Sequence, residues 1–226
     1  MLFCSQDFVV FFCLVFALYW AIPNPRARTW LLLAASFYFY ARWNQWLALL
    51  IIATSTMDFA VGLGLDRLRS ERNRRLLLVL ALAVNLGMLA AFKYANFFLD
   101  SFEAMANSCG FGVSIPTLTL ILPVGISFYK FESINYTVDV YRKRIPAERN
   151  LSHFLLFITF FPHLVAGPIV RAKDFLPQIG RLKRWDWARI ELGVSLFLLG
   201  LFKKMAIADR MALYVDPVFA HPESYG

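Results

Sequence analysis

The sequence is poor in charge, cysteine and histidine, and these shortages exclude several classes of protein. Charged residues make up 17% of the 226 residues, well below the roughly 25% of average soluble domains. Three cysteines without a Cys-x-x-Cys pair provide neither a disulfide framework nor a zinc site. No glycine-rich phosphate-binding loop and no Gly-x-Ser-x-Gly elbow occur either. The sequence therefore lacks the marks of disulfide-stapled, zinc-dependent and elbow-type hydrolase proteins, and we expect no bound metal.

Apolar residues dominate the composition in place of charge. They form 59% of the chain, and the mean hydropathy is +0.57. Several apolar runs that are almost free of charge approach the ~20 residues that a helix needs to cross a bilayer. The runs cover residues 8–22, 46–65, 76–92 and 192–202. They predict an all-α polytopic transmembrane helical bundle, with about seven membrane segments in a single membrane domain over residues 1–226.

Basic residues gather between the apolar runs and raise the net charge to +8. The positive-inside rule predicts that the basic loops face the cytoplasm, above all GLGLDRLRSERNRR at 62–75. Residues 99–116 are then expected to form an outside loop and residues 208–226 a terminal loop. Trp43 and Trp46 are expected to lie at the membrane interface. Neither a basic leader nor a small-residue cleavage site accompanies the first run, which predicts an uncleaved span. No folded basic domain is left outside the spans, so we expect no nucleic-acid binding.

Residues 151–170 are long enough to span, but both their flanks, 142–149 and 171–189, are basic. The positive-inside rule cannot place either flank outside. Within the segment, the stretch FPHLVAGP has two prolines, which remove backbone donors, and a glycine, which permits a sharp reversal. Irregular backbone at membrane depth must be covered by protein or water. We therefore predict a re-entrant or broken segment around 151–170 that lines an internal cavity.

A polar stripe follows one face of the helix expected before this segment. Tyr129, Glu132, Ser133 and Tyr136 recur at helical spacing, so they share that face. A polar stripe on an apolar membrane helix indicates either a wet cavity or hydrogen bonds between helices. Both interpretations stay open for Glu132, whereas hydrogen bonding between helices is favoured for Ser133.

Three other ionisable residues fall within or near apolar segments. Lys130 lies off the polar stripe, so we expect it to snorkel toward water or to form an ion pair. Asp58 is expected to pair with a basic group or to lie near the inner interface. His163 is the only histidine expected at membrane depth, and no nucleophile stands beside it in a recognisable arrangement. We therefore expect a hydrogen-bonded buried group there, not a catalytic base.

Four stretches of the chain stand in a recognisable order and spacing. They are FKYANFF at 92–98, LPVGISFYKFESINYTVDVYR at 122–142, FFPHLVAGPIVRAKDFLPQ at 160–178 and FKKMAIADR at 202–210. Together they resemble the membrane-bound O-acyltransferases, in the bacterial branch of the alginate O-acetylation protein, with the D-alanyl transfer protein of teichoic acids as a relative. The two long stretches are specific motifs, and the resemblance covers nearly the whole chain.

The resemblance implies a multi-pass acyltransferase of the bacterial inner (plasma) membrane with no bound cofactor. It would take acetyl groups from a cytoplasmic donor, acetyl-CoA or a carrier thioester, for O-acetylation of an exported polysaccharide such as alginate. The lipid bilayer, the polysaccharide acceptor and a periplasmic acetyltransferase are its expected partners. Passing an acyl group across ~30 Å of hydrocarbon requires a polar tunnel. The residues expected to line it are Tyr129, Glu132, Ser133, Tyr136, His163, Gly167 and Pro168.

The resemblance also implies that this chain holds no catalytic residue of its own. In the family the essential histidine lies later in the chain, and none of His153, His163 and His221 matches its position. We therefore expect the N-terminal portion of a longer enzyme, inactive alone. The family commonly has glutamine where Glu132 and His163 stand, and threonine where Lys130 stands.

Other functions stay open on the sequence. D-alanyl or peptidoglycan acyl transfer would apply similar chemistry to a different acceptor. A transporter would also use broken helices and polar groups within the membrane, but it predicts inverted repeats, and we find none in the sequence. A non-catalytic membrane scaffold for an acyl-transfer partner is the remaining alternative.

Overall fold

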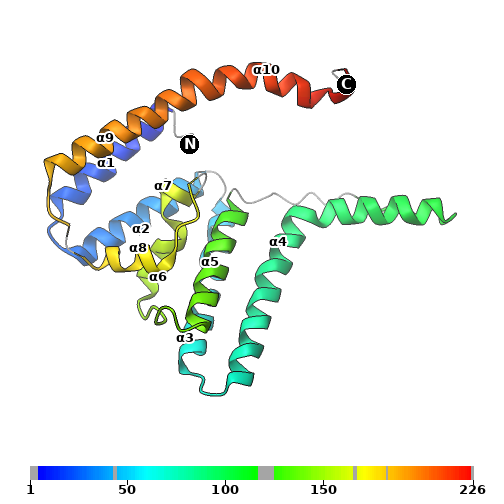
Figure 1. Ribbon diagram of the computed structural model, residues 1–226, viewed down its shortest axis with the longest axis horizontal. Helices are drawn as coiled ribbons and strands as arrows, with labels where there is room; N and C mark the ends of the chain where they lie inside the picture. The colour runs from blue at the N-terminus through cyan, green and yellow to red at the C-terminus, as the bar shows by residue number, and fades with distance from the viewer. Residues whose placement is uncertain (1–4, 43–44, 117–124, 165–166, 182, 225–226) are drawn as a thin grey trace. The chain divides into compact units, whose positions relative to one another are not determined.

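The computed structural model describes residues 5–42, 45–116, 125–164, 167–181 and 183–224. The secondary structure in those ranges is helical, with no strand, which confirms the all-α prediction (Figure 1). The helices are α1 (Gln6–Ala21), α2 (Pro25–Ala41), α3 (Gln45–Arg67), α4 (Glu71–Ser108), α5 (Ile126–Tyr141), α6 (Leu151–Thr159), α7 (Phe161–Leu164), α8 (Ala172–Ile179), α9 (Trp187–Phe202) and α10 (Asp209–Ala220). A π-helical turn, Lys203–Ala208, joins α9 to α10, and a short 3-10 turn, Pro222–Ser224, follows α10.

The chain divides into two compact units. The smaller unit combines α1 with α9 and α10, and the larger unit is Ile22–Arg181, with α2 to α8. Within the smaller unit, aromatic rings join α1 to the region of α9. Phe12 stacks on Phe197 with 6.3 Å between ring centroids, and Trp20 meets Trp185 edge-on at 5.0 Å. Aromatic contacts therefore hold together helices from the two ends of the sequence.

The core of the larger unit is built on three helices, α3, α4 and α5, each of which packs against the other two (Figure 1). α6 packs against α2 and α3. Phe154, Phe157 and Ile158 of α6 and Tyr129 and Tyr136 of α5 are completely buried. Removing such large side chains from solvent is the main favourable term in packing, and it fixes the positions of the polar groups beside them.

Caps that are visible in the sequence fix where α2, α6 and α9 begin. The side chains of Asn24, Asn150 and Asp186 each accept a hydrogen bond from the backbone N–H two residues on, at 2.9, 3.0 and 3.1 Å. These residue types are preferred N-caps because they satisfy a donor that the first turn leaves unpaired. Pro25 follows the first cap, where its fixed φ suits the first helical turn.

The segment at 151–170 is broken, as predicted. α6 ends at Thr159, the backbone turns out of the helix at Phe160 (ψ 111°), and α7 is only four residues long. Pro162 explains the break. Proline lacks the N–H that would bond the carbonyl four residues earlier, and its ring collides with that carbonyl. The segment is therefore not one continuous rod (Figure 1).

Two predictions about loops are wrong. Residues 99–108, predicted to begin an outside loop, continue α4, and residues 209–220, predicted to be part of a terminal loop, form α10. In both cases the polar composition suggested a loop. No glycine or proline interrupts residues 88–109 or 201–216, however, so intrinsic helix propensity decides the local structure.

Two of the described helices are long and apolar enough to cross a membrane, over Trp46–Arg67 and Glu71–Ser108. The apolar α1 is shorter. Leu76 and Leu80 are among the apolar side chains exposed along α4, which suits a surface in contact with lipid. Trp46 is also exposed, whereas Trp43 lies outside the described residues. The number of membrane segments stays a prediction.

Candidate functional site

Glu132 of α5 and His163 of α7 meet in the interior of the larger unit. Glu132 Oε2 lies 3.4 Å from His163 Nε2, and both side chains are more than nine-tenths buried. The two residues were predicted to belong to one site, and the break after α6 brings them together. A buried carboxylate beside an imidazole can share or exchange a proton with it.

The break between α6 and α7 leaves backbone groups that side chains satisfy. In a continuous helix the Phe161 N–H would bond the Phe157 carbonyl. Instead, His163 Nε2 lies 3.1 Å from that carbonyl oxygen, and the Phe161 N–H donates to Ser36 Oγ of α2 at 3.2 Å. His163 is therefore a hydrogen-bonded buried group, as expected from the sequence.

α5 also contacts the end of the broken segment that follows α7. The Val170 N–H donates to Glu132 Oε1 at 3.0 Å, so a single carboxylate contacts both His163 and Val170. Between them, Gly167 packs closely on α7, where an added Cβ would lie 2.4 Å from His163 Cα. That distance excludes any side chain unless the backbone moves. The predicted site residue Pro168 is exposed.

The other three predicted site residues face elsewhere. Tyr136 Oη accepts a hydrogen bond from the Glu148 N–H at 3.0 Å, and its ring packs 4.7 Å from Phe154. Tyr129 and Ser133 are buried, and their hydroxyls have no hydrogen-bond partner among the described residues. The predicted polar stripe is thus divided, with Glu132 at the broken segment and Tyr136 at the loop before α6.

A second polar cluster lies on a different face of α5. Lys130 is completely buried and its Nζ lies 4.0 Å from Asp58 Oδ2 of α3. The expected ion pair of both residues is confirmed, and snorkelling is wrong because no part of Lys130 reaches solvent. Asn85 of α4 bonds both charged residues and was missed. The sequence feature that could have revealed Asn85 is a single amide side chain inside the apolar run at 76–92.

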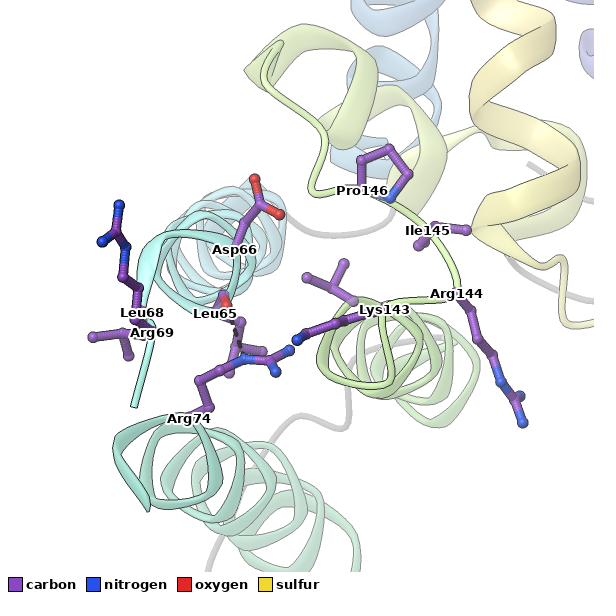
Figure 2. Close-up of a pocket in the computed structure, with 10 residues that line it drawn as sticks. Leu65, Asp66, Leu68, Arg69, Arg74, Lys143, Arg144, Ile145 and Pro146 are labelled. Atoms are coloured by element: carbon purple, nitrogen blue, oxygen red, sulfur yellow. Dashed lines mark hydrogen bonds between the residues drawn. The ribbon is translucent and has the colours of Figure 1, made fainter. Parts of the chain in front are cut away.

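A basic cavity of 580 Å³ lies where α3 and α5 end and α4 begins (Figure 2). Arg69, Arg74, Lys143 and Arg144 line it, with Asp66 as the acidic neighbour. Figure 2 shows Arg74 and Lys143 reaching toward each other and Arg144 directed away.

Arg74 of α4 links the ends of α3 and α5 at this cavity. Its guanidinium donates to the carbonyls of Leu65 and Tyr141, at 3.2 and 2.6 Å, and to Glu71 Oε1 at 2.8 Å. It thereby satisfies terminal carbonyls of α3 and α5 that have no partner within their own helices. Among the described residues, no group of three or more His, Cys, Asp or Glu side chains is placed to hold a metal ion.

Comparison with known proteins supplies the family context for this arrangement. The chain is 40% identical over 222 residues to a protein named "Probable alginate O-acetylase AlgI" from Pseudomonas putida, covering 97% of the chain and 45% of that protein. It is 41% identical over 223 residues to a protein of the same name from Azotobacter vinelandii, covering 97% and 44%. It is 35% identical over 220 residues to a "Peptidoglycan O-acetyltransferase" from Helicobacter pylori, covering 85% and 41%.

These similarities confirm the predicted resemblance to the membrane-bound O-acyltransferases. Within that family, they confirm the resemblance to the alginate O-acetylases. The chain spans less than half the length of the curated relatives named above. No family profile matches the chain, and no solved structure matches it at a significant level.

Proposed function

We propose that residues 1–226 are part of a longer membrane-bound O-acyltransferase that acetylates hydroxyl groups of an exported polysaccharide such as alginate. The observation that carries the proposal is the 40% identity to the alginate O-acetylase of Pseudomonas putida over 97% of the chain. Since the chain covers 45% of that relative, the catalytic histidine belongs outside residues 1–226 in this proposal. Residues 1–226 would form part of the polar route by which the acetyl group reaches that histidine.

The interior of the larger unit supports such a route. Glu132 and His163 are polar groups buried beside an interrupted helix, in a chain whose helices are otherwise mainly apolar. Irregular backbone and polar side chains are tolerated at membrane depth where they line a cavity or find partners in the protein. In the proposal, Tyr129, Ser133 and Tyr136 extend the polar lining along α5.

The donor is a cytoplasmic acetyl thioester, acetyl-CoA or an acetylated carrier, and no cofactor is bound permanently. The basic cavity supports this choice, because Arg69 and Lys143 lie where α3 and α5 end, on the side that the positive-inside rule assigns to the cytoplasm. Both donors carry phosphate, which arginine and lysine bind well. The protein itself is placed by the proposal in the bacterial inner membrane, as a multi-pass protein.

The acceptor lies on the outer side, and a periplasmic acetyltransferase is the expected partner. Peptidoglycan is the second candidate acceptor, because the relative from Helicobacter pylori is named a peptidoglycan O-acetyltransferase. The two candidate acceptors can be distinguished by measuring whether acetyl esters form on the exported polysaccharide or on muropeptides.

Deletion of the full-length gene tests the proposal. We expect ester-bound acetate on the exported polysaccharide to disappear and to return when the full-length gene is restored. Residues 1–226 alone should not restore it. Unchanged acetylation of both polysaccharide and muropeptides in the deletion strain would rule the proposed function out.

A further inference from the structure

Three helices of the larger unit each contribute one polar residue to a single buried cluster. Asp58 of α3, Asn85 of α4 and Lys130 of α5 have at most 1% of their surface exposed. The Asn85 amide lies between the two charges and is matched to both. Its Nδ2 donates to Asp58 Oδ1 at 2.7 Å, and its Oδ1 accepts from Lys130 Nζ at 2.9 Å.

The two charged groups do not bond each other directly. Lys130 Nζ lies 4.0 Å from Asp58 Oδ2, which is beyond hydrogen-bonding distance although close enough for an ion pair. Asp58 Oδ2 accepts no hydrogen bond from the described residues. Lys130 has three N–H donors, and Asn85 uses one of them. The unpaired carboxylate oxygen Asp58 Oδ2 and the remaining N–H donors of Lys130 therefore lie on opposite sides of a short gap.

Further buried polar atoms on α3 and α5 are also unpaired. The hydroxyls of Ser55, Tyr129 and Ser133 are buried and have no hydrogen-bond partner among the described residues. Ser55 lies one turn before Asp58 on α3, and Tyr129 precedes Lys130 on α5. Ser133 lies beside the Asp58 carboxylate, but its hydroxyl makes no hydrogen bond of regular geometry with it. Buried polar atoms are rarely left without hydrogen-bond partners. Several unpaired atoms in one region therefore indicate that a further hydrogen-bonding partner binds there.

The dimensions of the gap suit one oxygen atom. An oxygen placed ~2.8 Å from both Lys130 Nζ and Asp58 Oδ2 would see them at an angle of about 90°, given their separation of 4.0 Å. It would accept from the ammonium and donate to the carboxylate. Water can do both, and it has a second donor and acceptor for the neighbouring hydroxyls.

We propose that α3, α4 and α5 enclose a binding site for a water molecule, held between Lys130 Nζ and Asp58 Oδ2 and within reach of the unpaired hydroxyls of Tyr129 and Ser133. This site is separate from the Glu132–His163 pair. Tyr129 and Ser133 also belong to the proposed polar lining along α5, but the water site does not depend on the proposed acyl transfer. It makes the three-helix core wet at one point, where the apolar surroundings would otherwise be dry.

Cysteine labelling in native membranes tests the site. The full-length protein, with its native cysteines replaced, carries Ser133→Cys as the probe and Ala81→Cys as the matched control. Ala81 is equally enclosed, with 4% of its surface exposed, and lies one turn before Asn85 on α4. The reagent is a small neutral methanethiosulfonate, which reacts with thiolate, a form that needs water. We expect Ser133→Cys to react at least about tenfold faster than Ala81→Cys.

Two double variants make the test specific. Lys130→Met with Asp58→Leu removes the charges that hold the water, so the rate at Ser133→Cys should fall to that of Ala81→Cys. Lys130→Gln with Asp58→Asn keeps hydrogen-bonding groups and should keep the fast rate. Thermal unfolding of each variant checks that it is folded, and Ser55→Cys is a second probe if Ser133→Cys is not.

Equal rates at the probe and control positions would overturn the proposal. So would a fast rate that persists in the folded Met and Leu variant, because water would then be reaching Ser133 without the charged pair. A slow rate in the Gln and Asn variant, with fast labelling in the parent, supports a site that needs the charges themselves.

Discussion

Lys130 and Glu132 lie two residues apart on α5 and face opposite directions. Lys130 contacts Asn85 of α4 and Asp58 of α3, whereas Glu132 contacts His163 and the backbone of Val170. Successive residues advance by about 100° around a helix, so a spacing of two separates their side chains by about 200°. One helix therefore carries two polar centres that can be perturbed independently.

The first prediction concerns the charge of Glu132. Glu132→Gln in the full-length protein should leave acetyl transfer near normal, because the amide oxygen can still accept from the Val170 N–H. Glu132→Ala is the comparison, and it should lower the free energy of unfolding by ~1–3 kcal/mol by leaving that donor unpaired. Acetyl transfer and unfolding are measured for both. Complete loss of transfer in a stable Glu132→Gln protein would show that the carboxylate charge itself is required.

The second prediction concerns the buried ion pair. Lys130→Met or Asp58→Leu alone should each lower the free energy of unfolding by ~3–5 kcal/mol, because each leaves one buried charge without its partner. The double variant should regain most of that loss, since both charges leave together. Unfolding of all four proteins in detergent gives the coupling energy. A double variant no more stable than the worse single variant would refute the pairing.

The third prediction concerns the link between α2 and the α6–α7 break. Ser36→Ala should cost ~1–3 kcal/mol of unfolding free energy, because the buried Phe161 N–H loses its acceptor. Ser101→Ala is the matched control, since its hydroxyl is exposed and bonds only the Phe97 carbonyl of its own helix among the described contacts. That control should change stability by less than about 0.5 kcal/mol. Equal effects of the two substitutions would contradict the link.

The fourth prediction concerns the close approach at Gly167. Gly167→Ala should destabilise the protein by at least ~1–3 kcal/mol, because the new Cβ would collide with the backbone of His163. In Gly87→Ala the added Cβ meets nothing within 4 Å, and the change should stabilise α4 by up to ~1 kcal/mol. The melting temperatures of the two variants should therefore move in opposite directions. A stable Gly167→Ala protein would show that α7 shifts easily.

The break in the fold could be predicted from the sequence because its causes are local. Pro162 cannot sit within a continued α6, and Asn24 and Pro25 mark the start of α2 by their own chemistry. The sequence did not predict that α4 continues to Ser108 or that α10 forms, and the reason is again local. Polar residues suggested loops there, although no glycine or proline interrupts residues 88–109 or 201–216.

The polar contacts could be predicted only in part. Helical spacing places Tyr136 and Glu132 on one side of α5, but it does not say which neighbour each will meet. Tyr136 bonds the backbone of the loop before α6, and Glu132 bonds the segment after α7. Asn85 lies 27 positions from Asp58 and 45 from Lys130, so only the packing of three helices reveals their cluster.

Acetyl transfer in membrane vesicles tests the central claim most directly. Inverted inner-membrane vesicles from cells with and without the full-length gene receive acetyl-CoA labelled in its acetyl group, together with cytosol to supply any carrier. We predict labelled acetyl esters on the polysaccharide inside the vesicles only when the protein is present. Label that enters only as intact donor, or esters that form equally without the protein, would contradict the account.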